Sequence, residues 1–216
     1  MSNGSFDINE FVKDSKAVLT EPNYFATMKT SGGMTEPLIK AVIYGAISGV
    51  FIFLWSVLHV GPVTGGLFGG AIGVMAFIWA VVGAVIGLFI GAVILMILSS
   101  ICKGNTDFEA NARVIAAVMI VMPISSALSF FSGINFYLGI IVGLIVNIFA
   151  IWLTYKGLVQ ALKAKPDTAK IVLYVLIAIF VIFTLAGLGA KRRANQILND
   201  LNSSDFKELI EKAPEN

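Results

Sequence analysis

The sequence predicts an all-α polytopic membrane protein with five transmembrane helices and an interfacial amphipathic N-terminal helix. Hydrophobic residues make up 57% of the 216 residues and charged residues only 13%, so polar side chains are too few to cover a water-soluble globule. Mean hydropathy is +0.89. The apolar residues form long segments close to the roughly 20 residues that cross a bilayer as a helix.

Residues 1–36 are expected to form a cytoplasmic amphipathic segment. Asp7 is a candidate N-cap, and apolar residues recur on one helical stripe until Pro22 ends the helix. Such a helix lies in the bilayer interface with its apolar face toward the lipid. Packing of the same face on the protein itself is the alternative.

A five-helix transmembrane domain is predicted over residues 37–190, followed by a polar C-terminal tail at 191–216. The spans are expected at 37–60, within 63–102, at 114–131, at 136–155 and at 171–190. The second stretch is too long for one straight span, so we expect one long helix that ends near Cys102. A glycine-rich segment from Gly65 to Gly73 leads into it as a loop, a re-entrant turn or further helix.

Basic residues predict the topology. Most Lys and Arg residues fall in segments on the same side of the membrane as the N-terminus. The connections on the opposite side, from Gly61 onward and at 132–135, contain neither. The N-terminus is therefore expected in the cytoplasm. Five crossings then place the tail outside, which conflicts with the basic run Lys191, Arg192 and Arg193.

Small residues spaced four apart occur in three of the predicted spans, and they predict close helix packing because lipid supplies little hydrophobic drive between helices. The candidate packing residues follow this spacing or lie one turn beyond it: Gly45, Gly49, Gly83, Gly87, Gly91, Gly139, Gly143 and Asn147. Packing within one chain is the first interpretation, and oligomer formation through one groove is the second. We expect Gly87→Leu to disrupt packing of the bundle.

The sequence shows no parts of an active site. None of the five apolar cores contains Asp or Glu, which disfavours a proton-coupled transporter. One cysteine and one histidine exclude an internal disulfide and weigh against a His-based metal site. We therefore predict no catalytic, cofactor-binding or metal-binding residue and no enzymatic activity. A net charge of +2 does not indicate nucleic-acid binding.

Four lysines surround the predicted connection between the fourth and fifth spans, and they are candidates for contact with lipid headgroups: Lys156, Lys163, Lys165 and Lys170. A plain topology signal is the alternative interpretation of the same cluster. Pro123 in the third span is expected to kink that helix, with nearby serines bonding the freed carbonyl groups.

The order of several features resembles the Yip-one domain family, the Ypt/Rab-interacting five-span membrane proteins, in its prokaryotic form, over roughly residues 17–190. The resemblance depends on the layout of these residues: Pro22-Asn23-Tyr24-Phe25, Pro37, Gly104, Phe108, Arg113, Pro123, Trp152, Tyr155, Gly157, Leu158, Ala161 and Pro166-Asp167-Thr168-Ala169.

The resemblance implies a cytoplasmic N-terminus, five membrane helices and a prokaryotic cytoplasmic membrane. Eukaryotic relatives act in vesicle trafficking and in membrane recruitment of Rab GTPases. The Asp-Leu-Tyr-Gly-Pro and Gly-Tyr motifs of those relatives are absent here, which argues against a Rab-type partner. The partners expected instead are membrane lipids and other membrane proteins or a second copy of the chain.

Two functions fit these observations. The first is a non-enzymatic membrane scaffold or adaptor, with a role in membrane organisation or a trafficking-like process. It accounts for the many packing motifs and for the lack of a recognisable group of catalytic residues. The alternative is a small channel or transporter that uses the segment from Gly65 to Gly73 and the Pro123 kink as backbone-lined sites.

Overall fold

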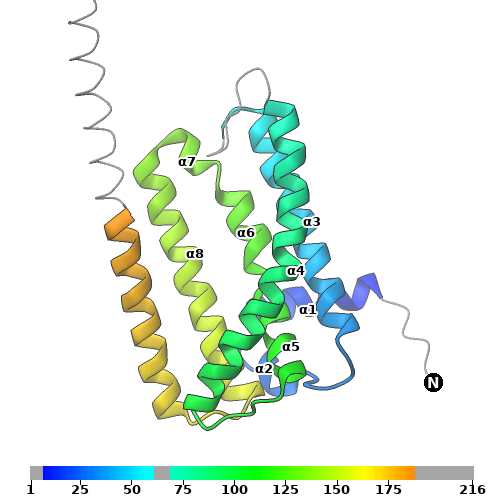
Figure 1. The fold of residues 1–216 in the computed structure, drawn as a ribbon, viewed down its shortest axis with the longest axis vertical. Helices are drawn as coiled ribbons and strands as arrows, with labels where there is room; N and C mark the ends of the chain where they lie inside the picture. Colours follow the sequence, from blue (N-terminus) through cyan, green and yellow to red (C-terminus); the bar gives the residue numbers. More distant parts are fainter. Residues whose placement is uncertain (1–6, 61–68, 188–216) are drawn as a thin grey trace, which may run out of the picture. The chain divides into compact units, whose positions relative to one another are not determined.

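The computed structural model describes residues 7–60 and 69–187. The chain divides into two compact units, Met1–Tyr174 and Val175–Asn216, and each is considered by itself. The described residues contain helices and no strand. Five segments are long and apolar enough to cross a membrane: Thr35–Val57, Gly73–Ile101, Phe108–Ile134, Phe136–Ala161 and Pro166–Gly187 (Figure 1). The all-α polytopic fold is therefore confirmed. The domain boundaries at 36/37 and 190/191 stay a prediction, and residues 191–216 lie outside the described residues.

Two short helices precede the first span. Helix α1 (Ile8–Thr20) begins where the Asp7 side chain accepts a hydrogen bond from the Asn9 backbone N–H, at 2.8 Å. Phe11 and Val18 on α1 are buried against the rest of the protein, whereas Ile8 and Val12 are 68% and 58% exposed. The helix thus packs on the protein with one part of its apolar surface and leaves another part uncovered. Helix α2 (Tyr24–Thr27) follows.

Helices α3 (Thr35–Val57) and α4 (Gly69–Ile101) form an antiparallel pair. The pair is close because α3 presents glycines to α4. A Cβ atom at Gly45 would lie 2.8 Å from the Cβ of Ala84, and one at Gly49 would lie 2.6 Å from the Phe77 ring. A single long helix in the second span is confirmed. Of the segment from Gly65 to Gly73, residues 65–68 lie outside the described residues and the remainder forms the first turns of α4.

The third span is interrupted twice. It consists of α5 (Phe108–Val118), α6 (Val121–Leu128) and the short α7 (Phe131–Ile134). Pro123 explains the first break, because it has no N–H for the carbonyl of Met119. That carbonyl accepts a bond from the Met122 N–H instead, at 2.9 Å. After the kink, the Ser126 carbonyl accepts bonds from the Ser129 hydroxyl at 2.8 Å and from the Trp55 indole N–H at 2.9 Å.

Helix α8 (Phe136–Lys156) begins at Asn135, whose side chain accepts bonds from two backbone N–H groups. It continues into a short π-helix, η2 (Gly157–Ala161). The connection after η2 pairs with the one after α4, because the Asn105 N–H donates to the Leu162 carbonyl at 2.7 Å and the Lys165 N–H donates to the Cys102 carbonyl at 2.9 Å. The last span, Pro166–Gly187, follows this pairing.

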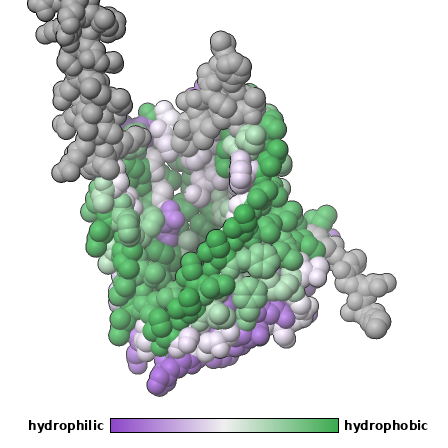
Figure 2. Space-filling model, in the orientation of Figure 1, coloured by the Kyte–Doolittle hydropathy of each residue, from purple (hydrophilic) through white to green (hydrophobic). Residues whose placement is uncertain are grey.

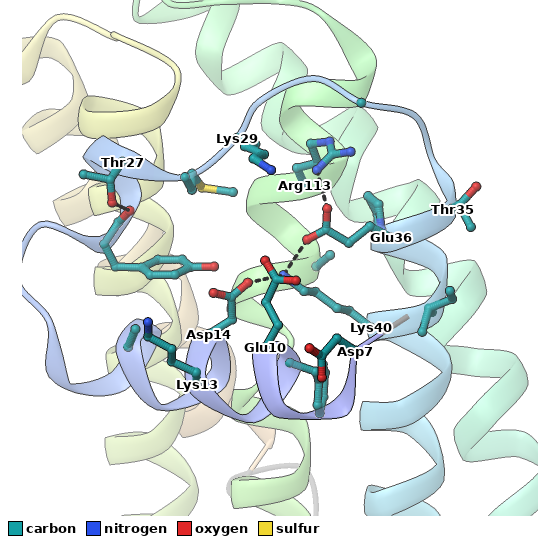
Figure 3. A pocket seen from close by; sticks show the side chains of 18 of the residues that line it. Asp7, Glu10, Lys13, Asp14, Thr27, Lys29, Thr35, Glu36, Lys40 and Arg113 are labelled. Carbon is teal, nitrogen blue, oxygen red and sulfur yellow. Dashed lines mark hydrogen bonds and ion pairs between the residues drawn. The ribbon is translucent and has the colours of Figure 1, made fainter. Parts of the chain in front are cut away.

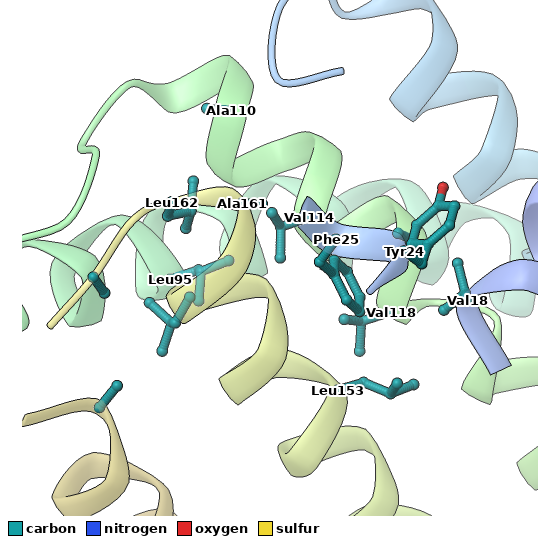
Figure 4. Close-up of a cluster of buried hydrophobic side chains, with 14 of the residues drawn as sticks. Val18, Tyr24, Phe25, Leu95, Ala110, Val114, Val118, Leu153, Ala161 and Leu162 are labelled. Atoms are coloured by element: carbon teal, nitrogen blue, oxygen red, sulfur yellow. The ribbon is translucent and has the colours of Figure 1, made fainter. Parts of the chain in front are cut away.

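Figure 4 shows the main buried cluster, in which α2 inserts Phe25 between Val114 of α5 and Leu153 of α8. This cluster lies near the end of the first unit where α1, α2 and the connections 102–107 and 162–165 meet, and we call that end the polar end. Hydrophilic side chains gather there in Figure 2, whereas most of the helix surface on the face shown is hydrophobic. The N-terminal helices therefore cover the polar end of an apolar bundle.

Candidate functional site

Five charged residues form a network at the polar end, where α1, α3 and α5 meet. We call Asp14, Glu36, Lys40, Glu109 and Arg113 the charge network. Its two cations are buried, with Lys40 only 7% and Arg113 only 6% exposed. Burial of a cation is costly unless carboxylates surround it. The network supplies those carboxylates from three separate helices.

Glu36 contacts both buried cations. Its two carboxylate oxygens lie 2.8 Å from Lys40 Nζ and 2.7 Å from Arg113 Nη1. Asp14 on α1 pairs with Lys40 at 3.1 Å (Figure 3). Glu109 pairs with Arg113 Nε at 3.0 Å. Within α3 and α5 the pairs are spaced i,i+4 with the acid first, which is the favourable orientation on a helix. Glu36 therefore joins α3 to α5 electrostatically.

A glycine turn before α3 completes the coordination of Arg113. The Gly33 carbonyl accepts a bond from Arg113 Nη2 at 2.9 Å, and the Gly33 N–H donates to Glu109 at 2.6 Å. Gly32 and Gly33 have φ angles of +131° and +93°, which favour glycine. A Cβ at Gly32 would also lie 3.0 Å from Arg113 Nη2. The turn thus brings the chain to within bonding distance of a buried guanidinium.

One tyrosine ties α1 to α3, and a second is buried near the charge network. The Tyr44 hydroxyl of α3 lies 2.7 Å from the Ser15 hydroxyl of α1, and its ring is 5.2 Å from the Phe11 ring. Tyr24 on α2 is buried, and burial raises the pKa of its hydroxyl to about 12. The phenol therefore stays neutral beside the charged groups.

A cavity of about 490 Å³ opens beside the charge network. It is lined by α1, by the chain between α1 and α3, by the first turns of α3 and by Arg113 of α5 (Figure 3). The sequence analysis did not predict this site, since it counted Lys40 among the basic residues that indicate topology and used Arg113 for that and for the family resemblance. The i,i+4 spacing of Glu36 with Lys40 and of Glu109 with Arg113 was the signal that pointed to it.

The predicted packing glycines fall into two groups. A Cβ at Gly45, Gly49, Gly91 or Gly139 would lie within 3.1 Å of a neighbouring atom, as close packing requires. At the other three positions a Cβ would meet no heavy atom within 4 Å: Gly83, Gly87 and Gly143. Asn147 is exposed, and its side-chain amide donates to the Gly143 carbonyl at 2.8 Å within the same helix.

The four candidate lysines also differ from one another. Lys156 donates a bond to the Pro22 carbonyl at 3.0 Å and lies 4.2 Å from the Trp152 ring centroid, so it ties α8 to the chain that precedes α2. Lys163, Lys165 and Lys170 are exposed. Within the described ranges, no group of three His, Cys, Asp or Glu side chains is arranged to hold a metal ion.

The helices and the charge network define a polytopic all-α membrane protein whose N-terminal helices are anchored to the polar end. The chain belongs to the Yip1 domain family, because the model of that domain matches residues 16–188. The match includes four members of the charge network: Glu36, Lys40, Glu109 and Arg113. No curated protein and no solved structure matches the chain.

Proposed function

We propose that the protein is a non-enzymatic integral membrane scaffold or adaptor that binds a second copy of the chain, other membrane proteins and lipid. A role in membrane organisation or a trafficking-like process would follow from such binding. Membership of the Yip1 domain family and five membrane-spanning helices are consistent with this role. The sequence contains no known catalytic motif, which favours binding over chemistry.

One observation carries the proposal. Gly45 and Gly49 on α3 already serve the close pair with α4, yet Gly83 and Gly87 on α4 are exposed with open space beside them. Glycines spaced four apart form a shallow groove that lets a second helix approach closely. The groove at Gly83 and Gly87 is therefore available for a helix from another chain. On α8, Gly143 has open space beside it and Asn147 is exposed, so these two residues offer a second face.

Lipid binding at the polar end is the second part of the proposal. Lys163, Lys165 and Lys170 are exposed there, and each lysine near an anionic surface contributes about 1 kcal/mol of attraction. Lys156 contributes less in this proposal, because its ammonium group already bonds the Pro22 carbonyl. We place the polar end and the N-terminus on the cytoplasmic side of a prokaryotic cytoplasmic membrane. The proposal includes neither a Rab-type GTPase nor nucleic acid as a partner.

Cysteine crosslinking in native membranes tests the groove. Ile90 lies three residues beyond Gly87 on α4 and is exposed, so Ile90→Cys should give a crosslinked dimer of the full-length chain. Adding Gly87→Leu should reduce that dimer at least about fivefold, since a branched side chain fills the groove. Ile141→Cys on α8 is the matched control: Ile141 is exposed, lies two residues before Gly143 and therefore on another side of the helix, and should crosslink weakly.

A chain that remains monomeric and crosslinks to no other protein would argue strongly against the scaffold. Ion or solute flux in liposomes that Pro123→Ala alters, with folding retained, would instead support the channel or transporter.

A further inference from the structure

The cavity beside the charge network has charged groups that the network does not use. Lys40 and Arg113 are already paired with carboxylates, so they have little capacity for another anion. Five further charged residues line the cavity, are exposed, and form no ion pair within the described part of the chain: Asp7, Glu10, Glu21, Lys13 and Lys29. The cavity therefore offers both free carboxylates and free ammonium groups.

Glu10 and Lys29 lie on different sides of the opening (Figure 3). Figure 3 shows Glu10 extending from α1 toward the network, with Asp7 on the same helix side, while Lys29 extends from the chain that precedes α3 on the opposite side. Lys13 lies farther along α1. A ligand that carries one positive and one negative group could pair with both sides at once, whereas a ligand with a single charge would meet a like charge on one of them.

The position of the cavity beside the first turns of α3 favours a lipid as its ligand. The first turns of α3 line it, and α3 is the first helix long and apolar enough to cross a membrane, so we place the cavity at the level of the bilayer headgroups. Ile8 and Val12 on the neighbouring α1 are exposed apolar side chains, suited to contact with acyl chains. The volume of about 490 Å³ falls in the roughly 300–1,000 Å³ range of small-ligand pockets.

We infer that the cavity binds the headgroup of a zwitterionic phospholipid that carries a primary ammonium group, of the phosphatidylethanolamine class. Glu10, with Asp7 beside it, accepts hydrogen bonds from the ammonium group, and Lys29 and Lys13 pair with the phosphate. A primary ammonium has three N–H donors for carboxylates, which a quaternary ammonium lacks. An anionic headgroup would pair with the lysines but would be repelled by the carboxylates. The inference does not depend on the α4 groove.

Binding of short-chain lipids to the full-length chain in detergent tests the inference. Dihexanoyl phosphatidylethanolamine should bind at least about tenfold more tightly than dihexanoyl phosphatidylcholine or dihexanoyl phosphatidylglycerol, since charge-assisted hydrogen bonds are lost with either competitor. Glu10→Gln and Lys29→Gln should each weaken binding of the ethanolamine lipid by about tenfold. Lys16→Gln is the matched control, because Lys16 is exposed on α1 and does not line the cavity.

Three results would overturn the inference. Equal affinity for the three lipids would show that the headgroup is not recognised. An equal loss of affinity in Lys16→Gln and Lys29→Gln would show a general charge effect. Glycerophosphoethanolamine that binds as tightly as the short-chain lipid would assign the cavity to a soluble zwitterion instead. Both cavity variants change exposed side chains, so thermal unfolding should show that they fold as the wild type does.

Discussion

Glu36 is the residue on which the charge network depends most. Lys40 and Arg113 each have one other carboxylate, Asp14 and Glu109 respectively, but only Glu36 bonds both cations. Removing Glu36 would leave each buried cation with one carboxylate in place of two, and a buried charge that loses a partner is costly. The five residues therefore stabilise the fold as a unit, and loss of the shared carboxylate affects three helices.

We predict that Glu36→Ala lowers the free energy of unfolding by about 2 kcal/mol, because two cations that are less than 10% exposed each lose one charge-assisted bond but keep one other carboxylate. Thermal or denaturant unfolding of the purified protein in detergent measures the change. Glu21→Ala, at an exposed acid that takes part in no ion pair among the described residues, should leave the midpoint almost unchanged. Equal midpoints for the two variants would contradict the role given to Glu36.

At the scale of elements, hydropathy predicted the five spans well and their ends less well. The third span begins at Phe108 rather than near residue 114, because Asp107 caps it and accepts a bond from the Ala110 N–H at 2.9 Å. Its first turns contain Glu109 and Arg113, and these charged residues lower the local hydropathy. A hydropathy scan therefore misses the start of the helix. The ion pair between Glu36 and Arg113 joins residues 77 positions apart in the sequence. A local sequence pattern cannot predict a contact between residues so far apart.

Glycine spacing predicted which helices carry packing motifs but not which face each motif presents. Ala84, Leu88 and Ala92 form the buried side of α4, while Gly83 and Gly87 lie on an exposed side. Both sets have i,i+4 spacing on the same helix, so sequence alone could not decide between them. The choice depends on where α3 packs, which is a tertiary property.

Alanine substitutions on the two faces should therefore differ. Gly45→Ala places a Cβ 2.8 Å from the Ala84 Cβ and 3.0 Å from the Val81 backbone, so it should destabilise the protein by about 1–3 kcal/mol. Gly87→Ala meets open space and should change stability by less than about 0.5 kcal/mol. Thermal unfolding in a detergent that keeps the chain monomeric distinguishes the two. A larger loss in Gly87→Ala would place that glycine in the bundle after all.

The first unit as a whole separates charge from apolar surface. Its charge network, lysines and N-terminal helices gather at the polar end, while the opposite end holds α7 and Asn135, where the connection at 132–135 has no Lys or Arg (Figures 1 and 2). Two of the basic residues that predicted this topology, Lys40 and Arg113, are buried in ion pairs, so they say less about orientation than the exposed lysines do. The predicted orientation therefore depends mainly on the exposed lysines: Lys13, Lys16, Lys29, Lys103, Lys163, Lys165 and Lys170.

That orientation predicts opposite labelling of the two ends by a membrane-impermeant maleimide. Ile134→Cys, at an exposed residue that ends α7, should react in intact cells, whereas Lys165→Cys should react only after permeabilisation. The native background should be low, because Cys102 is buried and burial raises the pKa of its thiol, which keeps it protonated and unreactive. Labelling of Lys165→Cys in intact cells, with Ile134→Cys protected, would reverse the topology. It would also place the charge network and its cavity at the outer leaflet, where the lipid proposed for the cavity would have to come from that leaflet.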